Sequence, residues 1–305
     1  MEFRDYTAGK DDDGRRLDRI LRIFLKDAGL GEIYKLVRKG LVKVNHKKAK
    51  PDSHVFEGDI ISIADFLINQ NEDKTEKAPS SKPFTLKIVF ENQHLLIIDK
   101  PYGRSVHGIE GQSIDEEVAS YYQTKKAGQP ADSMSFRPGP LHRLDRNTSG
   151  LLVFSMSLEG AHWFSEGIKN HTIQKKYYGL AEGKLLKAED WQDTINTDQT
   201  AITTASPLAY GRLGKLDVTL VEYAIKTGRK HQIRIQSQLH GHSLAGDKTY
   251  GGKPCPQLKR QYYLQAYSLT FPDNNPLDLP VQIKIGLSPD FISLLECCEI
   301  KNPGL

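Results

Sequence analysis

The stretch PLHRLDRNTSGLLVF, residues 140–154, places charged and polar side chains directly before an apolar run. Asp145 is its only acid, and Arg143 and Arg146 flank it. The run 151–154 is typical of a buried strand. Taken alone, the polar half is either a solvated turn or a carboxylate held at the entrance of a strand. The flanking arginines favour the ionised carboxylate, which can act as a nucleophile or as an electrostatic partner.

Apolar runs that predict further strands surround this stretch. The predicted strands cover 86–90, 94–100, 151–155, 176–183, 216–225 and 231–236. Helical patterns lie between some of them, at 113–126 and 158–170. Because the helices do not alternate regularly with the strands, a doubly wound parallel sheet is disfavoured. We expect an α+β fold around a mixed, mostly antiparallel central sheet.

The N-terminal part has the pattern of a small separate unit. Apolar residues recur with helical period over 15–29, a second short helix is expected over 31–40, and a strand over 57–63. Between residues 31 and 50 the only acid is Glu32, against seven lysines and arginines. Such a run can be a solvated face, but its clustering on a small unit favours phosphate binding. The candidate RNA contacts are Lys35, Arg38, Lys39, Lys43, Lys47 and Lys48.

A polar stretch with prolines and serines separates this unit from the rest of the chain and predicts a linker. The expected organisation is an N-terminal extension (1–14), the small basic unit (15–66), the linker (67–83), a large domain (84–295) and a tail (296–305).

The composition of the 305-residue chain excludes several classes of protein. The chain has three cysteines and no CxxC motif, which argues against a disulfide framework and a cysteine-based zinc site. The first residues are acidic and polar, unlike a signal peptide, and no apolar run approaches the ~18 residues that span a bilayer. We therefore expect a protein of the reducing cytoplasm.

Arg234 and Tyr177 are further candidates for the site. Arg234 lies between two isoleucines in HQIRI, which predicts a buried strand, and a buried arginine needs an anion. That anion is a carboxylate or a substrate phosphate, and we choose Asp145. Of Tyr177 and Tyr178, one is expected to face inward, where it can stack on a base or move a proton. His240 and His242 form an HxH pair without a third ligand, so no metal site is predicted.

Four segments, taken together and in this order, resemble the RluA-type pseudouridine synthases. They are IDKPYGRSVHG, HRLDRNTSGLLVF, KKYYGLAEG and TGRKHQIRIQ…GHSLAGDKTYG. The likeness covers 86–290, and 15–63 resembles the α-L RNA-binding module of a ribosomal protein. The overall layout is most similar to the family members of the RluC kind, which act on large-subunit ribosomal RNA.

The resemblance implies an isomerase that converts uridine to pseudouridine in structured RNA, without a cofactor or metal. It implies that Asp145 is the catalytic aspartate, that Tyr177 contacts the base and can take a proton, and that Arg234 pairs with the aspartate. Arg143 would fill the gap left by a flipped nucleotide. Whether Asp145 attacks C1′, adds to the uracil ring or supports a glycal route stays open.

The resemblance also sets the expected partner, ribosomal RNA, bound by a monomer away from membranes. Lys230 and Gln236 stand where the family usually has Thr and His, and these departures put the choice of substrate in doubt more than the activity. The alternative is a noncatalytic RNA-binding or ribosome-assembly factor that keeps the fold. A hydrolase is disfavoured because no second carboxylate lies at a convincing spacing.

Overall fold

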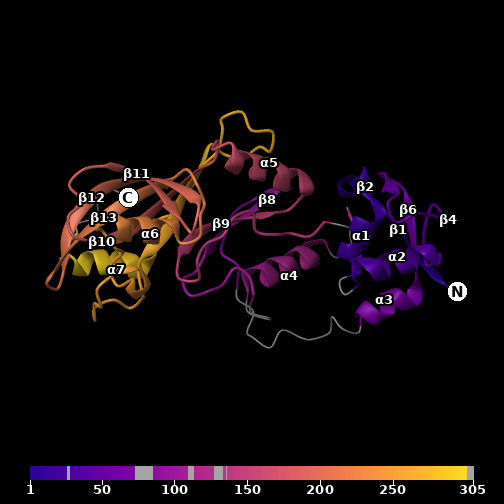
Figure 1. Ribbon diagram of the computed structural model, residues 1–305, viewed down its shortest axis with the longest axis horizontal. Coiled ribbons are helices and arrows are strands. Elements are labelled where there is room, and N and C mark those ends of the chain that lie inside the picture. The colour runs from indigo at the N-terminus through magenta and orange to yellow at the C-terminus, as the bar shows by residue number, and fades with distance from the viewer. Residues whose placement is uncertain (26–27, 73–84, 109–112, 127–132, 135, 301–305) are drawn as a thin grey trace. The chain divides into compact units, whose positions relative to one another are not determined.

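The chain is organised in two units. The computed structural model describes residues 1–25, 28–72, 85–108, 113–126, 133–134 and 136–300 (Figure 1). We call Met1–Phe84, Glu116–Gly139 and Met156–Glu159 the N-terminal unit, and Thr85–Asp115, Pro140–Ser155 and Gly160–Leu305 the C-terminal unit. This division differs from the boundaries expected from the sequence, because 116–139 belong to the N-terminal unit rather than to the large domain.

The N-terminal unit combines short helices with a four-stranded antiparallel sheet of order β1-β6-β3-β4. The strands are β1 (Phe3–Thr7), β3 (Val42–Val44), β4 (Lys47–Lys48) and β6 (Ile60–Ala64), and β2 (Arg15–Arg16) pairs separately with β5 (His54–Val55). The helices are the 3₁₀ turn η1 (Lys10–Asp12), α1 (Leu17–Phe24), α2 (Leu30–Arg38) and α3 (Asp65–Glu72). The helix α4 (Ile114–Lys126) lies mostly in this unit.

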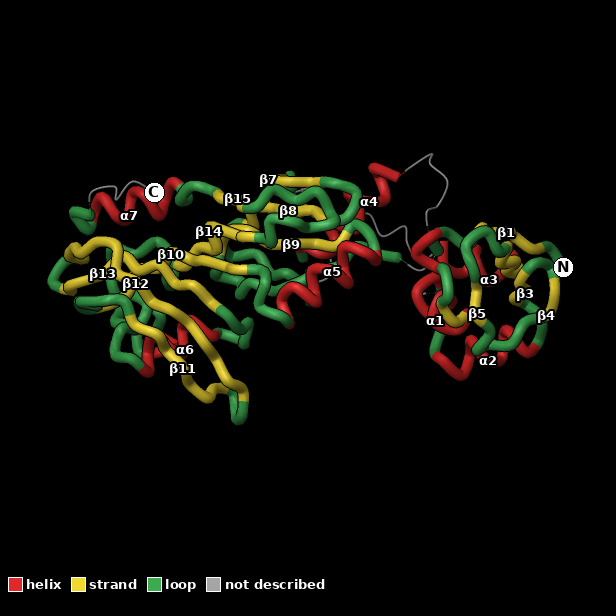
Figure 2. Tube along the Cα trace, turned by 90° about the horizontal axis from the view of Figure 1, so that it is seen from above, coloured by secondary structure: helices red, strands yellow, loops and turns green. Residues whose placement is uncertain are grey.

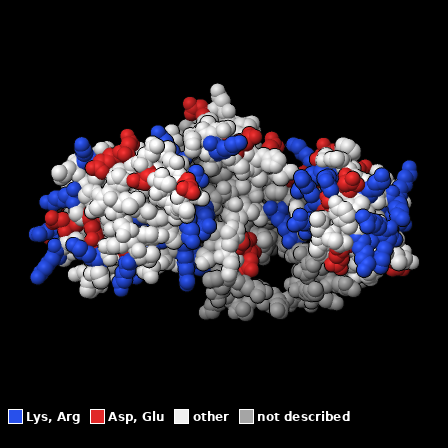
Figure 3. Space-filling model, in the orientation of Figure 1, with Lys and Arg blue, Asp and Glu red and all other residues white. Residues whose placement is uncertain are grey.

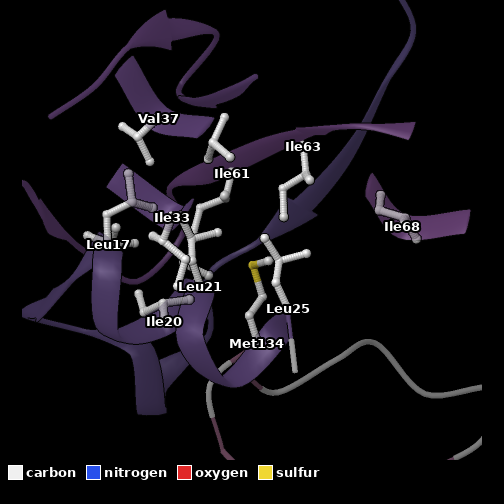
Figure 4. Close-up of a cluster of buried hydrophobic side chains, with 13 residues drawn as sticks. Leu17, Ile20, Leu21, Leu25, Ile33, Val37, Ile61, Ile63, Ile68 and Met134 are labelled. Atoms are coloured by element: carbon white, nitrogen blue, oxygen red, sulfur yellow. The ribbon is translucent and has the colours of Figure 1, made fainter. Parts of the chain in front are cut away.

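The core of the N-terminal unit confirms the helical period read from the sequence. Leu17 and Leu21 of α1 pack with Ile33 of α2 and Ile61 of β6, and all four side chains are fully buried (Figure 4). Met134, from the segment that follows α4 in the chain, completes the cluster. A residue more than 100 positions away therefore closes a core that looked local.

Three expectations about the edges of the units need correction. The predicted extension 1–14 contributes β1, which pairs along its whole length with β6. The first part of the predicted linker, up to Glu72, lies in α3, and the remainder lies outside the described residues. The predicted tail is folded at least to Ile300, because Cys298 and Ile300 are buried in the core against α7.

The C-terminal unit is built on a nine-stranded sheet (Figure 2). The order along the sheet is β11-β12-β13-β10-β14-β9-β8-β7, with β15 paired to β14. Only the pair β14–β9 is parallel, so the expected mixed, mostly antiparallel sheet is confirmed. The strands are β7 (Ile88–Glu91), β8 (Leu95–Lys100), β9 (Ser149–Ser155), β10 (Gln174–Glu182), β11 (Glu189–Ile195), β12 (Gln199–Leu213), β13 (Leu216–Ile225), β14 (Leu264–Thr270) and β15 (Gln282–Lys284).

Helices α6 (Gln232–Leu239) and α7 (Pro289–Cys297) cover opposite faces of this sheet, while α5 (Leu158–Lys169) packs beside β9. A short 3₁₀ turn, η2 (Lys248–Tyr250), follows α6. Because both faces are covered, most of β10 is buried, including the charged side chains of Lys175 and Glu182.

The strand predicted over 231–236 is wrong, because these residues begin helix α6. The buried residues of the segment include the polar Gln232, Arg234 and Gln236 as well as Ile233. Gln232 and Gln236 both face the sheet. Gln232 Nε2 donates to the Thr203 hydroxyl of β12, and that hydroxyl donates to Gln236 Oε1. The alternation of isoleucine with polar residues therefore suggested a strand, although the side chains follow a helical face.

The close approach of β9 and β14 places the loop that carries Asp145. Gly150 has a φ of 109° and pairs with Ala266, and a Cβ at Gly150 would collide with the Ala266 carbonyl. Only glycine meets both requirements. No helix in the described part of the chain is long and apolar enough to cross a membrane.

Candidate active site

A cavity of about 220 Å³ in the C-terminal unit collects the candidate residues. It is lined by the loop 141–148 before β9, by the start of β10, and by the segment 228–234 that leads into α6. Asp145, Tyr177, Arg234 and Arg143 all line it. The structure thus brings together the four residues that the sequence singled out in three distant segments.

Asp145 sits in a turn in which the Thr148 amide donates a hydrogen bond to its carbonyl, 3.0 Å away. Its carboxylate has two cationic or titratable neighbours. Oδ2 lies 3.6 Å from Nη1 of Arg234, and Oδ1 lies 3.6 Å from Nε2 of His231. The Asp145 side chain is 17% exposed, so it can be reached from the cavity. Neither oxygen is engaged in a short ion pair, which leaves the carboxylate available to a substrate.

Arg234 is buried as expected, but its main partner is Asp247 rather than Asp145. Its Nε and Nη2 donate to the two Asp247 oxygens over 2.6 Å and 2.8 Å. The guanidinium also lies over the rings of Tyr250 and Tyr262, 4.7 Å and 4.5 Å from their centroids. Burial alone would lower the pKa of Arg234, yet the hydrogen bonds to Asp247 raise it above its usual range. The fork fixes a permanent positive charge beside Asp145.

Tyr177 and Tyr178 point to opposite faces of β10, as the strand requires. Tyr177 lines the cavity, whereas Tyr178 stacks on Tyr267 at a centroid distance of 3.7 Å on the α7 face. Burial, and after it the charge of Asp145, raises the pKa of Tyr177 above its usual range. The Tyr177 phenol is therefore protonated at neutral pH.

His231 is a cavity residue that sequence reasoning did not assign to the site. It adopts a left-handed conformation with φ 57°, directly before α6, and its Nδ1 lies 2.7 Å from the Tyr250 hydroxyl. Burial lowers the pKa of His231 while the charge of Asp145 opposes that shift. Its position three residues before Arg234 in HQIRI was the available signal, and on the expected strand His231 and Arg234 would have faced opposite sides.

Lys100 braces the loop that carries Asp145. It is fully buried, and its ammonium donates to the carbonyls of Pro101, Arg104 and Arg146 at 2.9, 2.9 and 3.1 Å. Burial lowers the pKa of Lys100 to about 7, against the opposing charge of Asp145. Lys100 therefore links the loop after β8, through the carbonyls of Pro101 and Arg104, to the loop that carries Asp145, through the carbonyl of Arg146.

His142 and Arg146, which had no predicted role, hold the same loop. The Val153 amide donates to His142 Nε2 over 3.2 Å, and burial followed by the nearby Lys175 lowers the pKa of His142 to about 3. His142 is therefore a neutral acceptor. Arg146 Nε donates to the Gly103 carbonyl over 2.9 Å. Both residues position Asp145 through the backbone.

The two departures from the family pattern lie in different surroundings. Lys230 is exposed and lines the cavity. Gln236 is fully buried outside it, where Nε2 donates to Asp193 over 2.7 Å. His240 also contacts Asp193 and stacks on Trp191 with a centroid distance of 4.6 Å. These contacts give Gln236 and His240 a structural role.

The basic residues of the N-terminal unit gather on its surface (Figure 3). Arg38 and Lys48 line one shallow depression together with Arg16 and Lys50. Lys35, Lys39 and Lys47 are exposed, and the Lys43 ammonium lies 4.2 Å from the centre of the Phe3 ring. Their contact with RNA stays a prediction, but all except Lys43 present their charge to solvent.

Comparison with known proteins agrees with this geometry. The family model for RNA pseudouridylate synthase matches residues 94–239, and that for the S4 domain matches 15–61. The chain is 31% identical over 265 residues to ribosomal large subunit pseudouridine synthase C of Vibrio cholerae, covering 83% of this chain and 82% of that protein. The chain belongs to the RNA pseudouridylate synthase family. The Escherichia coli protein of the same name is 28% identical, covering 80% of this synthase and 78% of that protein.

Solved structures support the fold of the synthase. The human RNA pseudouridylate synthase domain containing 4 superposes with a TM-score of 0.57 at 21% identity, covering 71% of this chain and 94% of that chain. The human domain containing 1 gives a TM-score of 0.55 at 19% identity, covering 72% and 89%. The family models and the curated relatives identify the chain as an RNA pseudouridine synthase, an isomerase, with an S4 domain, as the four motifs and the basic N-terminal segment predicted.

Proposed function

We propose that this synthase isomerises one or more uridines of large-subunit ribosomal RNA to pseudouridine. The relatives that carry this substrate in their names share 28–31% of their residues with the chain over about four-fifths of its length. The S4 match adds a second RNA-binding element. We place the enzyme in the cytoplasm, acting as a monomer.

The observation that carries the catalytic assignment is the position of Asp145, open to the cavity and 3.6 Å from a guanidinium that is itself bonded to Asp247. Because the two-point hydrogen bond of Arg234 is made to Asp247, the guanidinium places a positive charge beside Asp145 without occupying both of its oxygens. Asp145 is then available for attack on C1′, addition to the uracil ring or support of a glycal route.

Tyr177 lies within the cavity with a protonated hydroxyl. We assign it to stacking against the uracil, with the hydroxyl as a hydrogen-bond donor in the resting enzyme. A base that stacks on an aromatic ring gains about 1–3 kcal/mol, which holds the uracil while it rotates after the glycosidic bond breaks.

Arg143 is exposed at the rim of the cavity. A uridine in a duplex must leave its stack to reach Asp145, which costs a few kcal/mol. A long cationic side chain that enters the vacancy offsets part of this cost, and it also neutralises neighbouring phosphates. We assign Arg143 to that role.

The noncatalytic alternative predicts the same RNA contacts without a reaction, so a map of modified bases separates the two. Pseudouridines are mapped across total RNA from cells with and without the gene. We expect one or a few large-subunit sites to lose pseudouridine and to regain it when the wild-type gene returns. An unchanged map would contradict the enzyme assignment, and a loss confined to transfer RNA would contradict the substrate.

A further inference from the structure

Lys175 is a buried cation in the cavity whose presence the proposed roles do not explain. It is 5% exposed, at the start of β10, and lines the same cavity as Tyr177. Among the described residues, no hydrogen bond or ion pair involves its ammonium group. A buried lysine without a partner is costly in the folded state, so its retention points to a ligand that arrives from outside.

The surroundings of Lys175 contrast with those of Lys100. Lys100 is equally buried but donates to three carbonyls. The cavity is lined by the apolar Leu141, Ile168 and Ile225 and by Gly228, and also by His142, whose pKa the charge of Lys175 lowers. A Cβ on that glycine would lie only 3.4 Å from Lys175 Nζ, so the bare backbone leaves the ammonium uncovered.

The position of Lys175 relative to Tyr177 gives the scale of the expected ligand. The two residues are separated by one position on a strand, so both face the cavity and their Cα atoms are about 6.6 Å apart. A single pyrimidine base can therefore contact both side chains. The Lys175 ammonium lies beside Gly228, whereas Asp145 lies beside His231 and Arg234, further along the same segment. Asp145 and the Lys175 ammonium thus contact different parts of the cavity wall.

We propose that the Lys175 ammonium binds O4 of the target uracil and stabilises the negative charge that develops there as the bond from N1 to C1′ breaks. O4 lies across the ring from N1, so with C1′ at Asp145 it points toward the opposite end of the cavity. Because Lys175 is buried in the cavity that also holds Asp145 and Tyr177, we take the base as its occupant rather than a phosphodiester of the RNA backbone. The inference rests on the proposed placement of Asp145 in the reaction.

The charge on O4 arises in each of the three routes. If Asp145 attacks C1′, or if a C2′ proton is lost to form a glycal, the N1–C1′ pair leaves with the uracil and is shared between N1, O2 and O4. If Asp145 adds to C6, the C5–C6 π pair moves through C4 onto O4. The pair returns when C5 bonds to C1′, the C5 proton leaves and N1 gains a proton, so nothing is oxidised. Lys175 would lower the barrier in all three cases.

The test compares Lys175→Met with Lys176→Met on an RNA in which wild-type enzyme has been shown to form pseudouridine. Lys176 is the matched control, because it is the next residue on β10, faces away from the cavity and pairs with Glu222 at 2.9 Å. Rates are measured in single turnovers at saturating enzyme as the loss of the target nucleoside, uridine in one transcript and 5-fluorouridine in the other, because 5-fluorouridine has no C5 proton to release and cannot complete the conversion to pseudouridine. Fluorine withdraws electrons and stabilises the departing ring without help from the protein.

We expect Lys175→Met to lower the rate constant on uridine by roughly 10²–10³-fold, with the half-saturating enzyme concentration unchanged. The loss should be clearly smaller on 5-fluorouridine, and Lys176→Met should react at the wild-type rate. The thermal midpoint of Lys175→Met should equal or exceed that of wild type, because an unpaired buried ammonium has been removed, and this shows that the variant is folded.

Two results would overturn the proposal. An unchanged rate on uridine would exclude a part for Lys175 in the chemical step. An equal loss on both substrates, with a raised half-saturating concentration, would identify a contact with the RNA backbone instead. Because the RNA is one that the wild-type enzyme already modifies, either result would leave the proposed function standing.

Discussion

The basic surface of the N-terminal unit and the cavity of the C-terminal unit use charge in opposite ways. On the surface, several lysines and arginines such as Lys35 and Lys47 are exposed and interchangeable, and salt screens them. In the cavity Asp145, Arg234 and Lys175 are largely buried, and each has its own neighbours. We therefore expect each exposed charge to change RNA affinity by a small and similar amount, and each buried charge to change the reaction rate by a large and individual amount.

The largest difference should follow from removing the cavity carboxylate. Asp145→Asn keeps the shape of the side chain but loses its charge, and we expect the rate of pseudouridine formation to fall by roughly 10⁴-fold or more. Because the basic surface is untouched, RNA affinity by filter binding should change little. Release of tritium from RNA labelled at C5 of uridine measures the rate, and near-normal release would remove Asp145 from the mechanism.

The second-largest effect should come from breaking the buried ion pair between Arg234 and Asp247. Arg234→Met leaves Asp247, which is 2% exposed, without its fork, and the free energy of unfolding should fall by about 3–5 kcal/mol. Arg234→Lys is the control, since it keeps the charge but not the two-point geometry, and it should lose less stability than Met. Denaturant unfolding provides the measurement. A Met variant as stable as wild type would show that the pair does not stabilise the fold.

The free energy of unfolding should depend on pH because of the buried Lys175. Burial lowers the pKa of Lys175 to about 8 from its usual 10.5, so between these values the unfolded chain binds more protons than the folded one. The stability of wild type relative to Lys175→Met should therefore rise with pH over this window and be lowest below pH 8. Parallel unfolding curves at pH 7 and pH 10 test this, and a constant difference would indicate an unshifted lysine.

A backbone change near the cavity should have an intermediate effect. Gly150→Ala forces a side chain into a positive φ and against the Ala266 carbonyl, and a loss of about 1–3 kcal/mol is expected from strain alone. Gly31→Ala is the control, because nothing lies within 4 Å of its Cβ position. Thermal unfolding separates the two, and equal midpoints would mean that β9 and β14 can move apart.

The smallest effect should come from single charges on the basic surface. For each of Arg38→Gln and Lys48→Gln, we expect the slope of log K against log salt to fall by roughly 0.7–0.9, with the rate at saturating enzyme unchanged. The exposed Lys284 on β15 in the C-terminal unit serves as the matched control. If neither slope changes, RNA does not bind in the depression that Arg38 and Lys48 line.

Much of the site could be predicted from local pattern, and the errors share a cause. Asp145 was identified because it is the only acid in a charged stretch beside an apolar strand. The need of Arg234 for an anion also followed from its apolar neighbours. The predicted partner Asp145 lies 3.6 Å from the guanidinium, but Asp247, which binds it through two shorter hydrogen bonds, was not predicted because that contact depends on which loop returns to α6. The strand expected over 231–236 was wrong because Gln232 and Gln236, four residues apart on one face of a helix, are buried and bond to Thr203 of β12.

By itself, the sequence determined the helical period of the small unit, the clustering of basic residues, the mostly antiparallel sheet and the motifs that mark the family. These properties depend on neighbouring residues, whose spacing is visible in a single chain. Tertiary structure alone decided that Met134 closes the N-terminal core, that Asp247 holds Arg234, and that Lys175 faces the cavity without a partner. Those properties depend on which distant segments meet, and on whether a buried charge finds an opposite one there.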